Sequence, residues 1–161
     1  MIEMEIVGVQ EVLPSSVPVV LLRESEGERL LPIFIGMPEA TAISLALAGQ
    51  DPPRPMTHDL MATLLATFSA TLERVVVTEL RERTFFAEMY LRGPAGVEVV
   101  SARPSDAIAL AVRTGASVFA VEEVVEQAGY LPPPTEEPVA EAQVEEFRAF
   151  LDSVEPEDFE G

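Results

Sequence analysis

Val97-Glu-Val-Val-Ser-Ala-Arg-Pro-Ser-Asp-Ala-Ile-Ala-Leu-Ala-Val-Arg113 changes from the composition of a strand to that of a helix within one short segment. Residues 97–101 are rich in β-branched side chains, which favour strands. Pro104 suits the first turn of a helix, and Gly115 can end it. We therefore predict a strand that leads into a helix over residues 104–113, with Ser105 or a neighbour as the N-cap.

The other segments of residues 1–131 repeat this alternation of strands and helices. Alternating or β-branched stretches predict strands at 2–12, 17–23, 29–35, 72–81, 84–92, 97–101 and 117–121. Helical spacing predicts helices at 38–48, from Thr57 onwards with Leu60, Leu64, Leu65 and Phe68 on one face, at 104–113 and at 122–128. This order predicts an α+β single domain, with helices packed on a largely antiparallel mixed sheet.

Residues 132–161 differ in composition from residues 1–131, so we place a domain boundary between the two ranges. The second range begins with a proline-rich linker and holds ten acidic side chains against one arginine. Val144, Phe147, Phe150 and Leu151 have helical spacing, which predicts a short amphipathic helix. The alternative is a solvated acidic tail.

The composition and the net charge limit the functions that this chain can have. With 28 acidic and 10 basic residues, the chain carries a net charge of -18, which repels phosphate backbones unless metal ions or local arginines offset it. The chain has no cysteine, which excludes disulfides and thiolate chemistry. No segment resembles a signal peptide or a membrane span, so we expect a cytoplasmic protein without a membrane partner.

Two polar motifs precede predicted helices in the first half of the chain. Glu39 lies in the opening turn of the first helix, where the helix dipole stabilises a carboxylate by roughly 0.3–1 kcal/mol. The only histidine, His58, follows Thr57, a good N-cap, and precedes Asp59. His58 is a candidate general base or metal ligand, with Asp59 as a second ligand or orienting group. A structural role in helix capping explains these residues equally well.

Two further motifs lie in the second half. Arg103 precedes a helix start, where it could bind a phosphate or carboxylate together with free backbone amides. Ser105 and Asp106 suit capping, and Asp106 is also placed to pair with Arg103 or Arg54. The charged turn at residues 81–84 is interpreted as a solvated hairpin tip rather than a binding patch.

Three of these motifs together resemble the bifunctional nuclease domain family. The resemblance covers about residues 1–130 and is carried by Leu31-Pro-Ile-Phe-Ile-Gly36 with Glu39-Ala40, by Arg54-Pro-Met-Thr-His-Asp59 and by Arg103-Pro-Ser-Asp-Ala-Ile-Ala-Leu110. It implies an α+β single-domain fold, a homo-oligomer with a dimer as the expected form, and cleavage of RNA or DNA. The family's recurring polar positions fall on Glu39, Arg54, Thr57, His58, Asp59, Arg103, Ser105 and Asp106.

The first functional hypothesis is therefore a metal-dependent nuclease or phosphodiesterase. His58, Asp59 and Asp106 are its candidate catalytic residues, and an oxygen-rich Mg²⁺ or Mn²⁺ site would use Glu39, Asp59 and Asp106. The candidate substrate-binding residues are Arg54, Thr57, Arg103 and Ser105. The second hypothesis is a non-enzymatic oligomeric module that binds a ligand or a partner, in which the same residues are caps and salt bridges.

Overall fold

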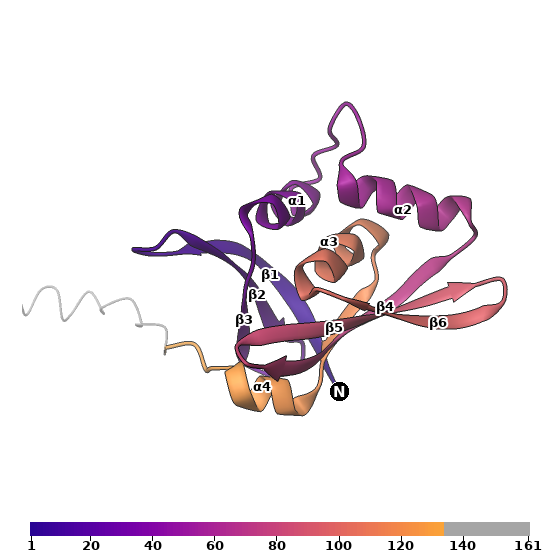
Figure 1. Ribbon diagram of the computed structural model, residues 1–161. Coiled ribbons are helices and arrows are strands. Elements are labelled where there is room, and N and C mark those ends of the chain that lie inside the picture. The colour runs from indigo at the N-terminus through magenta and orange to yellow at the C-terminus, as the bar shows by residue number, and fades with distance from the viewer. Residues whose placement is uncertain (134–161) are drawn as a thin grey trace, which may run out of the picture. The chain divides into compact units, whose positions relative to one another are not determined.

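The computed structural model describes residues 1–133, which form one mixed sheet of seven strands with four helices (Figure 1). The predicted helix at residues 139–154 lies outside the described residues. The elements in chain order are β1 (Ile2–Val12), β2 (Val17–Glu24), β3 (Leu30–Phe34), α1 (Met37–Leu47), α2 (Thr57–Thr67), β4 (Thr71–Arg81), β5 (Thr84–Gly93), β6 (Gly96–Ala102), α3 (Pro104–Thr114), β7 (Ser117–Ala120) and α4 (Glu122–Ala128).

The sheet consists of two three-stranded antiparallel units joined by a central strand. Its strand order is β3-β2-β1-β7-β4-β5-β6. The central strand β7 pairs antiparallel with β1 and parallel with β4, and every other pairing is antiparallel. The predicted α+β fold with a largely antiparallel mixed sheet is therefore confirmed for the described residues.

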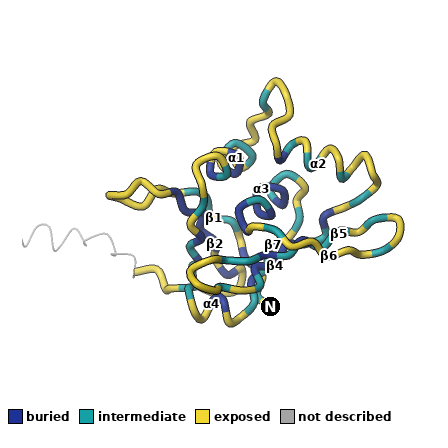
Figure 2. The backbone as a smooth tube through the Cα atoms, in the orientation of Figure 1, coloured by how far each residue is buried: buried dark blue, intermediate teal, exposed yellow. Residues whose placement is uncertain are grey.

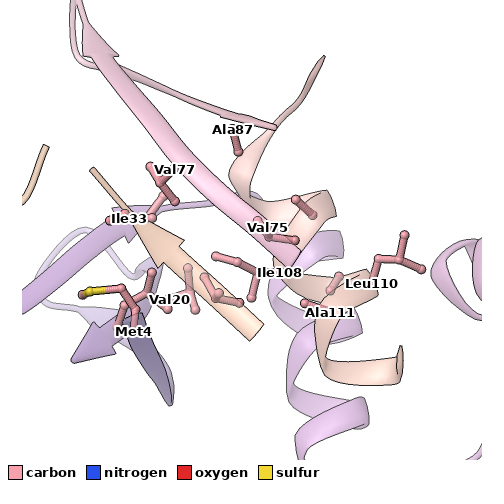
Figure 3. Packing of buried hydrophobic residues seen from close by; sticks show 14 of the residues in the cluster. Met4, Val20, Ile33, Val75, Val77, Ala87, Ile108, Leu110 and Ala111 are labelled. Atoms are coloured by element: carbon pink, nitrogen blue, oxygen red, sulfur yellow. The ribbon is translucent and has the colours of Figure 1, made fainter. Parts of the chain in front are cut away.

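Helix α3 is the most deeply buried helix of the described chain. Residues 107–111 are all at most 1 % exposed, because α3 packs against β4, β5 and β7 on one side and against α1 and α2 on the other. Figure 2 shows α3 in the buried colour beneath the more exposed α1 and α2. The side chain of Ile108 lies beside that of Val75 in Figure 3, and both belong, with Leu110, to the buried core.

The helices occupy both sides of the sheet. In Figure 1, α1, α2 and α3 lie on one side and α4 lies on the other. The buried α4 residues Val124 and Val125 complete the core there. The chain then returns to β3 through backbone hydrogen bonds between Leu30 and Tyr130. The polar motifs around Glu39, His58 and Arg103 lie at the starts of α1, α2 and α3.

The ends and faces of two helices differ from the prediction. Neither Thr57 nor Ser105 is an N-cap, because Met56 and Arg103 occupy those positions. Of the four residues predicted to share the apolar face of α2, Leu65 packs against the core, whereas Leu60, Leu64 and Phe68 are 48 %, 47 % and 72 % exposed. The helix packs through partly buried Met61, Ala62 and Leu65 and through buried His58.

The helices of residues 1–133 are short. The longest of them have 11 residues, and none is long and apolar enough to cross a bilayer.

We predict that Ile108→Ala lowers the free energy of unfolding by about 2–5 kcal/mol, because it removes a fully buried side chain at the centre of the core. Urea unfolding followed by circular dichroism measures the loss. The matched control is Leu64→Ala on the exposed face of α2, which we expect to cost under about 1 kcal/mol. Equal losses in the two variants would contradict the central position of α3.

Candidate functional site

The starts of α2 and α3 meet through a direct contact between His58 and Asp106. The two residues are 48 positions apart in the sequence, and His58 Nε2 lies 2.9 Å from Asp106 Oδ1. The His58 side chain is 9 % exposed and the Asp106 side chain is 25 % exposed. Since the carboxylate only accepts hydrogen bonds, Nε2 is the protonated nitrogen of the neutral ring, and Nδ1 retains its lone pair.

Arg103 links this pair to the first helix. Its Nε donates to Asp106 Oδ2 at 2.7 Å, and its Nη2 donates to Glu39 Oε1 at 2.9 Å. The Arg103 side chain is 66 % exposed, whereas Glu39 is 15 % exposed. Glu39, His58, Arg103 and Asp106 therefore form one continuous network, and its guanidinium faces solvent.

The network fixes the charge of Asp106. Burial alone would raise the pKa of this carboxyl, but hydrogen bonds from Arg103 and His58 outweigh burial and hold the pKa below its usual value. The hydrogen bonds to Asp106 and Glu39 raise the pKa of Arg103 in turn. Asp106 is thus an anion at neutral pH.

A second ion pair lies on the other side of the α2–α3 contact. Asp59 Oδ1 accepts from Arg113 Nε at 2.6 Å, and Asp59 Oδ2 accepts from the Met56 backbone N–H at 2.9 Å. Arg113 is 9 % exposed and also donates to the carbonyls of Ala42 and Ala109. The hydrogen bonds from Arg113 and Met56 lower the pKa of Asp59. Asp59 therefore joins α2 to α3 and α1, which is a structural role.

Arg113 is a partner of Asp59 that no local sequence pattern indicates. Its position in the last turn of a helix is ordinary for a basic residue, because the helix dipole favours a cation there. Only the packing of α1 and α2 around α3 reveals that Arg113 donates to both neighbours.

The remaining predicted site residues separate into two groups. Ser105 lines an open hollow together with Arg103, so the structure brings these two substrate-binding candidates together. Arg54 and Thr57 are exposed, and neither forms a side-chain hydrogen bond or an ion pair within residues 1–133. Arg83 and Thr84, at the turn between β4 and β5, are exposed and line the same hollow as Arg103.

The carboxylates predicted to bind a metal ion are occupied by cationic side chains. Glu39 and Asp106 both accept from Arg103, and Asp59 accepts from Arg113. Among residues 1–133, no group of three or more histidine or acidic side chains is arranged to hold a metal ion. The described arrangement does not fit a metal site, and the predicted Mg²⁺ or Mn²⁺ stays a prediction.

We predict that Asp59→Asn lowers the free energy of unfolding at pH 7 by about 1–3 kcal/mol, because it leaves the buried Arg113 charge without its anionic partner. Urea unfolding gives the value. Asp51→Asn is the matched control, since Asp51 is exposed and forms no ion pair within the described residues. A loss in Asp59→Asn no larger than in the control would contradict the structural role.

The same variant tests the pH dependence of stability. The pKa of Asp59 is lower in the folded than in the unfolded protein, so its contribution is present above about pH 4 and is lost as the pH falls through the folded pKa. We expect the stability difference between wild type and Asp59→Asn to shrink from pH 7 to pH 3. A difference that stays constant over this range would show that the Asp59 carboxylate is not held ionised by Arg113.

Comparison with known proteins identifies the family of this chain. Two proteins of Mycobacterium tuberculosis are each 44 % identical to it over 162 residues, which cover 98 % of this chain and 97 % of each relative. They are Uncharacterized protein MT1877 of strain CDC 1551 and Uncharacterized protein Rv1829 of strain H37Rv, names that state no activity. The bifunctional nuclease domain matches residues 20–132, which include all three polar motifs. The chain belongs to the bifunctional nuclease domain family.

Proposed function

We propose that this protein is a nuclease that cleaves phosphodiester bonds of RNA or DNA. The family name supports the class of reaction. The observation that carries the proposal is the network of His58, Asp106 and Arg103, in which an imidazole oriented by a carboxylate lies next to an exposed guanidinium. These are the groups that proton transfer at a phosphodiester requires.

His58 is the proposed general base. Asp106 accepts the Nε2–H, which fixes the ring and leaves Nδ1 as the proton acceptor. Within residues 1–133, Nδ1 has no hydrogen-bond partner, so its lone pair is available to an attacking hydroxyl or water. Because the side chain is 9 % exposed, the reacting group of the substrate must approach the small accessible edge of the ring.

Arg103 is the proposed phosphate-binding group. Its Nε donates to Asp106 and its Nη2 donates to Glu39, whereas Nη1 forms no hydrogen bond within the described residues. A positioned, solvent-facing guanidinium suits a phosphate oxygen and the negative charge that develops on it during cleavage.

Asp59 is left out of the chemistry, because one carboxylate oxygen accepts from Arg113 of α3 and the other accepts from the Met56 backbone at the start of α2. No step is assigned to a divalent metal ion, since the carboxylates that would bind it are paired with arginines. The divalent metal ion predicted from the sequence is therefore tested as a variable in the cleavage assay.

The second candidate is a non-enzymatic module, and the complete pairing of these carboxylates favours it. In that case the network would hold α1, α2 and α3 together without acting on a substrate. The two candidates differ in what loss of the imidazole should do: a nuclease loses turnover, whereas a structural network loses only stability.

We predict that His58→Gln and Asp106→Asn each lower the cleavage rate of single-stranded RNA or DNA by about 10²–10⁴-fold, as expected for the loss of a general base. Cleavage of labelled oligonucleotides is followed with Mg²⁺, with Mn²⁺ and with a chelator. Arg103→Gln should also lower the rate. The matched control is Arg23→Gln, because Arg23 pairs with Glu5 far from the network in sequence and is half exposed.

Circular dichroism and urea unfolding establish that each variant is folded before its rate is interpreted. Absence of cleavage by the wild type under all three conditions would overturn the nuclease proposal. Equal rates in wild type, His58→Gln and Asp106→Asn would overturn the assignment of the network as the active site. A rate in chelator equal to the rate with Mg²⁺ or Mn²⁺ would remove the metal requirement.

A further inference from the structure

A hollow of about 280 Å³ lies where β3, the β4–β5 turn and the start of α3 come together. The polar residues that line it are Arg83, Thr84, Arg103 and Ser105, and the aromatic ones are Phe34 and Phe85. Arg103 thus faces two sites, because it also belongs to the network with His58. This volume is slightly below the roughly 300–1,000 Å³ of small-molecule sites, so the hollow suits only a small ligand.

Ser105 is the strongest sign that the hollow receives a ligand. The residue is 7 % exposed, borders the hollow, and its hydroxyl has no hydrogen-bond partner within residues 1–133. The only fully sealed side-chain polar atom that lacks a partner in those residues is Arg74 Nε, so the Ser105 oxygen retains an opening. Because its oxygen opens into the hollow, this nearly buried hydroxyl can donate to a ligand oxygen bound there.

The start of α3 adds one free backbone donor, the Ser105 amide, at the same wall. Arg103 is the N-cap and Pro104 follows it, and no side chain forms a capping hydrogen bond there. The carboxylate of Asp106, the acidic residue of the first turn, accepts from His58 and Arg103 instead. The amide of Ser105 and the positive end of this 11-residue helix therefore remain available to an anion.

Arg83 supplies the positive charge that the hollow needs. Six of the nine arginines in residues 1–131 form ion pairs, whereas Arg54, Arg74 and Arg83 form none within the described residues. Arg74 lies against the Tyr90 ring. Glu39 and Asp106 offset much of the charge of Arg103, so Arg83 is the uncompensated cation of this wall.

Arg83 lies in a tight turn with an unusual backbone conformation. Glu82 and Arg83 both have positive φ, 49° and 65°, in the two-residue connection of the β4–β5 hairpin. Asn and Gly are favoured at such positions, so the sequence keeps two charged side chains where smaller residues would be easier to accommodate.

An exposed aromatic ring completes the chemistry. Phe34 ends β3, borders the hollow and is 61 % exposed, although a phenylalanine is usually buried. A flat apolar ring beside cationic and hydroxyl donors suits a nucleotide, because the base can stack on the ring while the phosphate meets the donors.

We infer that this hollow binds one nucleotide unit through its phosphate. Arg83, Arg103, the Ser105 hydroxyl and the start of α3 contact the phosphate, and Phe34 stacks on the base. The site deepens the proposed nuclease function, and it rests on that function only for the source of the nucleotide. Two sources share this chemistry: a free mononucleotide, and the 5′-phosphorylated end of a nucleic acid chain.

Isothermal titration calorimetry on the full chain, in a chelator-containing buffer, tests the inference. The probes are adenosine 5′-monophosphate, adenosine, and a short single-stranded DNA with or without a 5′-phosphate. We expect the monophosphate to bind at least about tenfold more tightly than adenosine, the change that one charge-assisted contact of 1.4 kcal/mol produces. Tighter binding of the phosphorylated DNA than of the mononucleotide identifies a chain end as the ligand, and weaker binding identifies the free nucleotide.

Three variants locate the site. We expect Arg83→Gln to weaken binding of the monophosphate about tenfold, and Ser105→Ala and Phe34→Ala to weaken it about three- to tenfold. The matched control is Arg81→Gln, two residues from Arg83 on the same hairpin but outside the hollow, which should bind as the wild type does. No binding of the monophosphate, or equal affinity in Arg83→Gln and wild type, would overturn the inference.

The binding experiment and the cleavage experiment can fail separately. The mononucleotide has no phosphodiester bond to cleave, and Arg83, Ser105 and Phe34 lie outside the proposed acid–base pair. Binding without cleavage of any oligonucleotide would retain the nucleotide site and overturn the nuclease proposal. Cleavage without binding of the monophosphate would retain the nuclease proposal and overturn the site.

Discussion

Burial of helix α3 is the constraint on which the rest of the structure depends. Residues 107–111 have almost no contact with solvent, because strands cover one side of the helix and α1 and α2 cover the other. Polar groups are therefore confined to its two ends, where Ser105 and Asp106 lie near the start and Arg113 lies in the last turn. Since a buried charge is stable only when it is paired, both ends recruit partners from the neighbouring helices.

This arrangement gives the two ends of α3 different roles. At the end that carries Arg113, the guanidinium is almost fully buried and its three acceptors belong to three helices, so the contact holds the helical layer together. At the start of α3, Arg103 is largely exposed, so this side of the network is open to solvent. In the proposed nuclease, the end that carries Arg113 would keep the network of His58, Arg103 and Asp106 in position.

The position of the hollow answers the objection that a chain with a net charge of -18 should repel nucleic acid. Long-range repulsion depends on the whole charge distribution, whereas contact depends on the groups within a few ångströms. Around the hollow, carboxylates are engaged by Arg103, and Arg83 and a helix start supply positive potential. A small anionic ligand can therefore be favoured locally on an acidic protein, while binding along an extended duplex is not.

The sequence by itself determined the order of strands and helices in residues 1–131. Hydrophobic periodicity acts over a few neighbouring residues, and so do the helix starts at Pro38 and Pro104 and the helix end at Gly115. It also selected His58, Arg103 and Asp106 as polar residues at helix starts.

Only the tertiary structure decided that Asp106 pairs with both His58 and Arg103, that Asp59 pairs with Arg113, and that Arg54 joins neither pair. Likewise, only the packing of α2 exposed Leu60 and Phe68, and only the curvature that brings β3 to the β4–β5 turn placed Arg83 in a hollow. Contacts between segments 48 or more residues apart depend on how the helices pack, and local patterns carry no record of that geometry.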